Sequence, residues 1–258
     1  MAYNETARTS FEDADVAQAY RHRPPYAREL YDALNALVPD TRRALDIGCG
    51  PGKITQELAR TFEHVDAVDP SIEMLKVAAS NSAARNVTWL HATAEDVVLT
   101  GTYDLVTAGS SIHWVRHEVL FPKLKDLMSY GAVIAIINGD GAHRPPWERE
   151  WTQFMIRWLG RLGKKYDPKG FSTEGHIHET WMDIQGRKSF VHSFSQSING
   201  FIECQHSRAT WARSKLGPMA FEFDAELAAL LKPYSEGGNL LYKVENELVW
   251  GTPRETDT

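Results

Sequence analysis

The sequence predicts an α/β fold with a mostly parallel sheet and helices on both of its faces. Short apolar runs alternate with helical patterns as far as Asn138, a glycine-rich turn follows the first run, and two extended segments return near the end. Strands that alternate with helices form parallel sheets through right-handed crossovers. Five such strands and the two late ones therefore predict a seven-stranded sheet in a single domain of 258 residues.

This domain, residues 1–258, divides into four consecutive parts. They are an N-terminal helical cap (1–40), a core (41–139), an aromatic-rich insertion after the fifth strand (140–187), and C-terminal strands and helices (188–258). The cap is expected to be helical because apolar side chains recur at helical spacing on both sides of Pro24 and Pro25, which must interrupt the helix.

Each core strand is a short apolar run that ends at a turn. The expected strands cover residues 43–48, 64–69, 87–91, 103–108 and 132–137. Helical spacing predicts helices over 53–61 and from Pro70 to Ser80. The late extended segments are expected at 188–203 and 239–250.

The composition argues against several classes of protein. The net charge of -6 does not suit a broad nucleic-acid-binding surface. No apolar run approaches the ~20 residues of a membrane span, and the N-terminal residues lack the pattern of a secretory signal. The two cysteines, Cys49 and Cys204, make no disulfide framework. We therefore expect a cytoplasmic protein with neither a membrane nor a nucleic-acid partner.

The strongest motif is D-I-G-C-G-P-G, which runs from Asp46 to Gly52 where the first strand ends and a helix begins. Glycines at 48 and 50 remove side chains where the backbone must approach a ligand closely. Asp69 ends the second strand about twenty residues later, where an acid can bind the hydroxyls of a ribose. A nicotinamide fingerprint would place glycine at position 53, but this chain has Lys53. A nicotinamide oxidoreductase is therefore the poorer interpretation.

Several segments together resemble the class I S-adenosylmethionine-dependent methyltransferases, most closely small-molecule enzymes of the trans-aconitate and ubiquinone-biosynthesis methyltransferase type. The matching segments are Y-R-H-R-P-P-Y (20–26, shifted by one residue), D-I-G-C-G-P-G (46–52), V-D-P-S-I-E-M-L (68–75), T-A-E-D (93–96), S-S-I-H-W (110–114) and W-G-T-P (250–253). The resemblance implies a Rossmann-like sheet and S-adenosyl-L-methionine as cofactor. The insertion matches no part of the pattern, so it is the expected site of substrate choice.

The resemblance also implies a role for each matched position. Gly48 and Gly50 would line the amino-acid part of the cofactor, and Asp69 would hold its ribose. Met74 would pack on the adenine, with residues 94–95 at the adenine edge. The cofactor-binding residues expected in this way are Tyr20, Arg23, Asp46, Gly48, Cys49, Gly50, Asp69, Pro70, Met74, Ala94, Glu95 and Ser110.

The candidate catalytic residues, Tyr20 and His113, are expected near the sulfonium of the cofactor. Ser110 would lie beneath it, while Tyr20 and Arg23 would close over the methionine tail. The aromatic face of Tyr20 can also support the sulfonium, and His113 is the candidate general base if the acceptor arrives protonated. His113 and His117 are four residues apart, but no third ligand accompanies them, so we expect no metal site.

Four aromatic side chains in the insertion lie on one face of a predicted helix. Trp147, Trp151, Phe154 and Trp158 recur at helical spacing. The favoured interpretation is a helix that packs onto the sheet. The alternative is a lid whose aromatic face forms the substrate pocket.

The leading functional hypothesis is methyl transfer to a small-molecule acceptor by a monomer or homodimer. A second hypothesis keeps the cofactor but attacks another sulfonium carbon, by cyclisation or aminocarboxypropyl transfer with release of methylthioadenosine. A third is a non-catalytic, cofactor-binding regulatory subunit. The acceptor and its nucleophilic atom are not encoded in any motif of the sequence.

Overall fold

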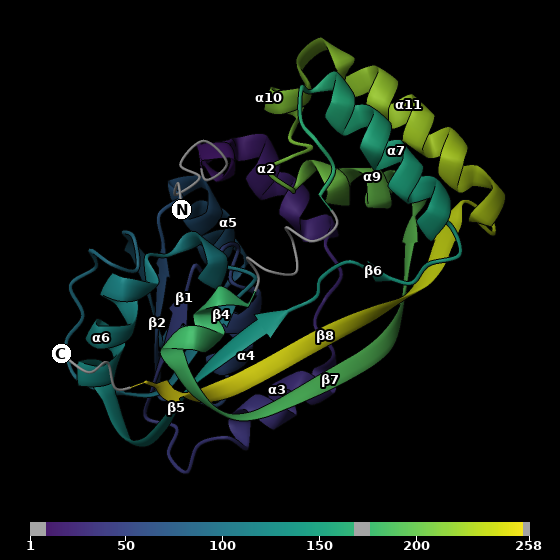
Figure 1. Ribbon diagram of the computed structural model, residues 1–258. Coiled ribbons are helices and arrows are strands. Elements are labelled where there is room, and N and C mark those ends of the chain that lie inside the picture. Colours follow the sequence, from purple (N-terminus) through teal and green to yellow (C-terminus); the bar gives the residue numbers. More distant parts are fainter. Residues whose placement is uncertain (1–8, 168–175, 255–258) are drawn as a thin grey trace.

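The computed structural model describes residues 9–167 and 176–254. Within these residues, eight strands form one sheet in the order β3-β2-β1-β4-β5-β8-β6, with β7 paired to β8 (Figure 1). The strands are β1 (Arg43–Ile47), β2 (His64–Asp69), β3 (Val87–His91), β4 (Tyr103–Gly109), β5 (Met128–Asn138), β6 (Ala142–His143), β7 (Met182–Ser197) and β8 (Asn239–Pro253). Strands β1 to β5 are parallel, and β8 is antiparallel to β5, β6 and β7. The predicted α/β class and mostly parallel sheet are confirmed.

The sheet has one strand more than the predicted seven, because β6 continues the line of β5 along β8. Asn138 at the end of β5 lies opposite Glu247, and Ala142 in β6 lies opposite Val244. Between them the backbone turns at Gly139, whose φ is 88°, and a Cβ atom there would overlap the carbonyl oxygen of Glu245. A two-residue strand of this kind carries too little pattern to be found in a sequence.

The strand expected at 188–203 begins and ends earlier than predicted. It is β7, which ends at Ser197, and α9 follows directly. The Ser197 hydroxyl accepts a hydrogen bond from the backbone N–H of Gly200 at 3.0 Å and so caps the helix. Apolar residues at 198, 201 and 202 fit one face of a helix, so the earlier interpretation of this stretch as a strand was wrong.

Helices cover both faces of the sheet and extend beyond it. The α-helices are α2 (Ala14–Ala19), α3 (Arg28–Asn35), α4 (Lys53–Leu58), α5 (Ile72–Asn81), α6 (His117–Leu127), α7 (Glu148–Arg161), α9 (Ile198–His206), α10 (Arg213–Leu216) and α11 (Ala220–Leu231). Short 3-10 helices are η1 (Thr9–Glu12), η2 (Tyr20–His22), η3 (Ile112–Trp114), η4 (Ile177–Trp181), η5 (Gly217–Met219) and η6 (Lys232–Tyr234). Among the described residues, no helix combines the length and apolar character needed to cross a membrane.

The described part of the N-terminal cap consists of η1, α2 and η2, followed by an extended turn through the two prolines into α3. Val16 and Ala17 of α2 are buried against Met74 of α5 and Ala212. This contact places the cap beside the carboxyl ends of β1 and β2 (Figure 1).

A helical subdomain of α7, α9, α10 and α11 lies at the far end of the β7–β8 ribbon (Figure 1). Trp147, Phe154 and Trp158 are fully buried there, with the last two rings 5.0 and 5.1 Å from the ring of Phe223 in α11. The aromatic face of α7 therefore packs mainly against helices that come later in the chain, together with Tyr242 of β8. These partners lie outside the predicted insertion, of which residues 168–175 fall outside the described residues.

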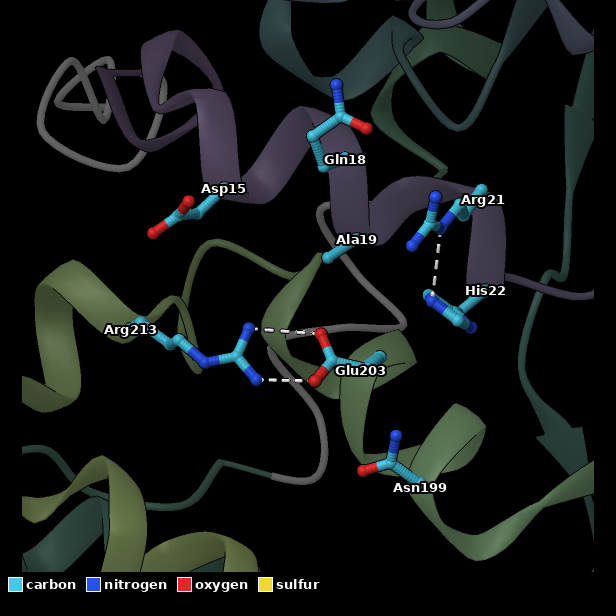
Figure 2. Close-up of a pocket in the computed structure, with 8 residues that line it drawn as sticks. All are labelled: Asp15, Gln18, Ala19, Arg21, His22, Asn199, Glu203 and Arg213. Carbon is cyan, nitrogen blue, oxygen red and sulfur yellow. Dashed lines mark hydrogen bonds and ion pairs between the residues drawn. The ribbon is translucent and has the colours of Figure 1, made fainter.

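A polar cavity of about 350 Å³ lies between the cap and the helical subdomain, beside the contacts that join them. Figure 2 shows its lining, which comes from α2 and η2 on one side and from α9 and α10 on the other. Arg213 and Glu203 form a two-armed ion pair across its floor, with distances of 2.5 and 3.0 Å. None of the site residues predicted from the sequence lines this cavity.

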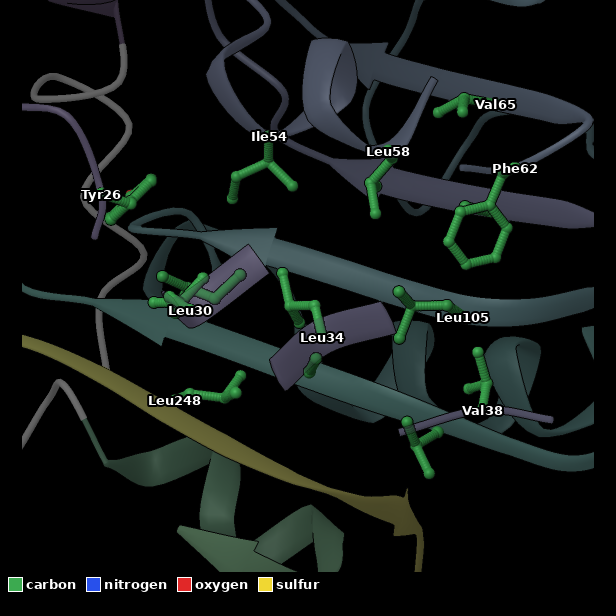
Figure 3. Close-up of a cluster of buried hydrophobic side chains, with 14 of the residues drawn as sticks. Tyr26, Leu30, Leu34, Val38, Ile54, Leu58, Phe62, Val65, Leu105 and Leu248 are labelled. Carbon is green, nitrogen blue, oxygen red and sulfur yellow. The ribbon is translucent and has the colours of Figure 1, made fainter. Parts of the chain in front are cut away.

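Neighbouring residues of the central strands enter different cores because strand side chains alternate between faces. Val133 of β5 belongs to the cluster under α3 and α4 (Figure 3). The next residue, Ile134, belongs to the cluster under α6. Both faces are buried, which explains the continuous apolar character of these strands. Packing on both faces thus holds the carboxyl ends of the central strands in place.

Candidate cofactor-binding site

The loop after β1 contains three glycines with positive φ angles. Gly48, Gly50 and Gly52 have φ values of 61°, 54° and 83°, a region that other residues rarely adopt. A Cβ atom at Gly48 would lie 2.5 Å from the Cβ atom of Ser111, whereas one at Gly50 would meet nothing within 4 Å. Packing therefore requires glycine at 48, while Gly50 leaves open space in front of the backbone.

Asp69, the last residue of β2, joins this loop to the next one. Its two carboxylate oxygens accept hydrogen bonds from the backbone N–H groups of Gly50 and Ser71, each at 2.8 Å. The residue is buried, with 7% of its surface exposed. Asp69 therefore holds the two loops together, at the position where the sequence predicts contact with ribose hydroxyls.

Asp46 and Cys49 lie under the loop, where they support it. The Asp46 carboxylate accepts hydrogen bonds from the hydroxyls of Thr55 at 2.6 Å and Thr107 at 2.9 Å, and burial raises the pKa of Asp46 to about 6. Burial also raises the pKa of the Cys49 thiol well above its usual range. The structure turns both side chains into the protein, so their predicted contact with a ligand stays a prediction.

Lys53, the first residue of α4, fastens the N-terminal cap to this loop. Its Nζ atom donates hydrogen bonds to the carbonyl oxygens of Arg23 at 3.0 Å and Pro24 at 2.9 Å, and burial lowers the pKa of Lys53 to about 8. The guanidinium carbon of Arg23 lies 3.9 Å from the centre of the Tyr20 ring, and its Nη1 atom donates to the Tyr20 hydroxyl at 3.0 Å. The predicted residues Tyr20 and Arg23 are thus brought together beside the loop.

Ser110 follows β4 and has a φ of 52°, which is uncommon for a residue with a side chain. Its backbone N–H donates to the carbonyl oxygen of Ile137 at 2.8 Å, which fixes the turn to β5. The hydroxyl groups of Ser110 and Tyr26 lie 3.5 Å apart. Strained backbone of this kind is concentrated at functional sites, and here it lies two strands from Asp69.

His113 lies in η3, just beyond Ser110, with its ring 4.7 Å from that of Trp114. The residue is exposed to solvent, although neighbouring protein atoms surround much of its ring. This burial, with a smaller contribution from the charge of Arg23, lowers the pKa of His113 to about 4. The imidazole is therefore neutral near pH 7 and able to accept a proton.

Comparison with known proteins places this geometry in a family. Residues 44–130 match the family profile described as "Methyltransferase domain". An uncharacterized methyltransferase of Mycobacterium tuberculosis is 34% identical over 138 residues, which are 53% of this chain and 55% of that protein. The profile match and this relative support the class I S-adenosylmethionine-dependent methyltransferase superfamily for residues 44–130.

Two further proteins are similar to this chain, one in sequence and one in fold. A probable S-adenosylmethionine-dependent methyltransferase of Saccharomyces cerevisiae is 29% identical over 130 residues, 47% of this chain and 45% of its own length. The solved structure of a candidate type II methyltransferase from Anaeromyxobacter dehalogenans covers 90% of this chain and 99% of its own, with a TM-score of 0.70 and 22% identity. The latter shows a shared fold. The chain spans about half the length of the curated relatives that it matches.

The family match covers only part of this candidate site. The glycine loop, Asp69, Ser110 and His113 lie within residues 44–130. The cap and the helical subdomain lie outside that range. Within the described parts of the chain, no group of three His, Cys, Asp or Glu side chains could hold a metal ion.

The segments predicted to contact adenine are held in place by contacts within the protein. Met74 is only 2% exposed and packs against α2, so the structure turns its side chain toward the cap. The carbonyl oxygens of Ala94 and Glu95 accept hydrogen bonds from Nζ of Lys123 at 3.1 and 3.0 Å. The Glu95 carboxylate accepts one from the backbone N–H of Arg116 at 2.7 Å. Pro70 is exposed and lies just before α5. Its carbonyl oxygen lies 3.0 Å from the Nε2 atom of His91.

Sequence reasoning did not find three polar groups near Tyr20 and Arg23. Asp140 lies two residues after β5 and is buried, Ser207 follows α9 and is buried, and the next residue, Arg208, is half-buried. Arg23 donates to the Ser207 hydroxyl at 2.8 Å and to the Asp140 carboxylate at 2.9 Å. Asp140 and Ser207 are each more than a hundred positions from Arg23 in the chain, so no local motif could reveal these contacts. The local signal is an acid placed two residues after the last parallel strand.

Proposed function

We propose that this chain binds S-adenosyl-L-methionine and transfers its methyl group to a small-molecule acceptor. The observation that carries the proposal is the hydrogen bond between Asp69 and the backbone N–H of Gly50. It sets a hydroxyl-accepting carboxylate beside a glycine with open space in front of it. The match of residues 44–130 to a methyltransferase domain supports the choice of cofactor, and the strained turn at Ser110 supports a reacting centre beside β4.

The residues present fit this cofactor. Asp69 would accept hydrogen bonds from the ribose hydroxyls, Gly50 would admit the amino-acid part, and Tyr20 with Arg23 would close over it. S-adenosyl-L-methionine, when bound, supplies a methyl group that its sulfonium has already activated. The protein then has to orient the acceptor and exclude water, which can contribute about 7–11 kcal/mol.

Two observations support a small acceptor over a macromolecule. The chain carries a net charge of -6, which does not favour a nucleic-acid partner. Arg23 of the cap contacts Ser207 of the helical subdomain and Asp140 beyond β5. The cap and the helical subdomain therefore meet over the carboxyl edge of the sheet, which favours a small acceptor. We propose a monomer or homodimer that needs no membrane or nucleic-acid partner.

The decisive experiment follows the fate of the cofactor. The protein is incubated with S-adenosyl-L-methionine labelled on the methyl group and with a metabolite extract, and products are identified by mass spectrometry. Methyl transfer yields S-adenosylhomocysteine and a labelled metabolite. Methylthioadenosine would instead show attack at another sulfonium carbon. Cofactor binding without turnover would leave a regulatory binding protein.

Replacing Asp69 by alanine should weaken S-adenosylhomocysteine binding by about 1.5–3 kcal/mol, the scale of a hydrogen bond to a charged group. The thermal midpoint should fall as well, because the N–H groups of Gly50 and Ser71 lose their acceptor. Calorimetric titration measures the affinity. Asp183→Ala, at an exposed carboxylate in β7, is the control. Unchanged affinity in Asp69→Ala would remove the ribose assignment.

If His113 takes a proton from the acceptor, turnover should fall as pH drops through about 4, because only the neutral imidazole accepts a proton. His113→Asn should abolish this acidic limb and lower kcat by about 10²-fold or more. The pH–rate profile of both proteins checks this. His176→Asn, at an exposed histidine paired with Glu179, is the control. A profile with the same limb in His113→Asn would exclude the base role.

A further inference from the structure

Three cations in the site share a single carboxylate. Asp140 accepts hydrogen bonds from Arg23 at 2.9 Å through one oxygen and from Arg208 at 3.2 Å through the other. Lys53 lies in the same group, close enough for the charges of Asp140, Arg23 and Arg208 to affect its pKa. Its Nζ atom donates hydrogen bonds to two carbonyl oxygens and lies 5.6 Å from the centre of the Tyr20 ring. Among the described residues, no second carboxylate lies within 4.0 Å of any of these cations.

The surplus of positive charge lies in surroundings that are mostly protein. Arg23 and Asp140 are buried, with side chains 6% and 9% exposed. Removing charge from water without a counter-ion is costly. An anionic group brought by a ligand would offset this cost, and attraction between charges is stronger where water is excluded.

Arg208 has hydrogen-bonding capacity left for such a group. Of its guanidinium nitrogens, only Nη2 has a partner among the described residues, and that partner is Asp140. The side chain is 32% exposed, so its Nε and Nη1 atoms are not sealed inside the protein. Arg23 differs, because its Nε, Nη1 and Nη2 atoms all have partners. A planar guanidinium with free N–H groups suits a carboxylate.

The position of this cluster places it near the proposed acceptor rather than near the proposed ribose contact. Asp140 follows β5, and Asp69 ends β2, three positions away in the strand order. Strands lie about 4.8 Å apart, so the two carboxylates are separated by roughly 14 Å across the sheet. Ser110 follows β4, which lies between β2 and β5 in the strand order. Ligand groups near Arg208 are therefore on the side of Ser110 away from Asp69.

We propose that Arg208 binds a carboxylate group of the methyl acceptor, with Lys53 and Arg23 adding positive charge and Asp140 orienting the guanidinium. The acceptor class is thus a small carboxylic acid. This inference rests on the proposed function, because it assigns the other half of the same site. Asp140 acts as a positioning residue, since it touches Arg208.

The test uses simple carboxylates as probes. Protein saturated with S-adenosylhomocysteine is titrated by calorimetry with acetate, succinate and benzoate, and with their uncharged amides as controls. At least one carboxylate should bind saturably and its amide should not. Arg208→Gln should weaken that binding at least tenfold, Arg208→Lys should retain part of it, and Arg157→Gln, which removes an exposed cation on α7, should leave it unchanged.

Affinities for S-adenosylhomocysteine and methylthioadenosine separate the two sources of a carboxylate, because only the first carries one. Arg208→Gln should alter neither affinity. Weaker binding of S-adenosylhomocysteine alone would show that Arg208 holds the cofactor carboxylate and would overturn the inference. So would failure of all three carboxylates to bind, or equal binding of acids and amides. Failure of the unmodified protein to bind S-adenosylhomocysteine would overturn the proposed function itself.

Discussion

Gly50→Val should lower the affinity for S-adenosylhomocysteine more than 100-fold, to below detection by calorimetry. The new side chain would project into the only part of the glycine loop where a Cβ atom meets nothing within 4 Å. That space is where the proposed ligand must approach the backbone. A branched residue at a φ of 54° also costs of order 1–3 kcal/mol of stability, so binding must be compared between equally strained proteins.

Gly237→Val provides that comparison. Gly237 has a φ of 57° and open space around its Cβ position, but it lies in the turn that precedes β8. Both variants should lose similar thermal stability, and only Gly50→Val should lose binding. If a folded Gly50→Val protein binds with normal affinity, the loop is not the ligand site.

Trp158→Ala should destabilise the protein by about 3–5 kcal/mol, the usual cost of removing a buried aromatic side chain. Trp158 is fully buried against Phe154 and Phe223, and its indole N–H donates to Glu226 at 3.1 Å. Chemical denaturation followed by tryptophan fluorescence and circular dichroism measures the loss of stability.

Ile156→Ala on the same helix is the matched control, because Ile156 is 42% exposed and should cost little. The two interpretations of the aromatic face differ in outcome. If the aromatic face is a structural core, Trp158→Ala lowers the stability of the protein. If it is a substrate lid, Trp158→Ala lowers kcat/KM and leaves the stability unchanged. Unaltered unfolding of Trp158→Ala would therefore restore the lid interpretation.

The glycine loop and the parallel core could be predicted because their requirements are local. Positive φ angles at 48 and 50 restrict those positions to glycine, and burial on both faces makes each core strand a continuous apolar run. The spacing from Gly50 to Asp69 then follows from one strand–helix–strand unit. The position proposed for the ligand could therefore be predicted from local sequence alone, without contacts between distant segments.

The helical subdomain and the cluster around Asp140 could not be predicted in this way. Periodicity identified the apolar face of α7, but not its partner Phe223, which comes after β7 in the chain. The pairing of Arg23 with Asp140 and Ser207 depends on how three separated segments converge. Charge patterns in a sequence carry no record of such convergence.

The kink at Gly139 determines more than the path of a strand. Asn246 of β8 donates from its side-chain amide to the Gly139 carbonyl and accepts from the backbone N–H of Ala27, so one buried amide spans the kink and the start of α3. Any side chain at 139 would push against β8 and displace the next residue, Asp140. If Arg208 binds the acceptor as proposed, the choice of acceptor therefore depends in part on Gly139, a residue that does not itself contact the ligand.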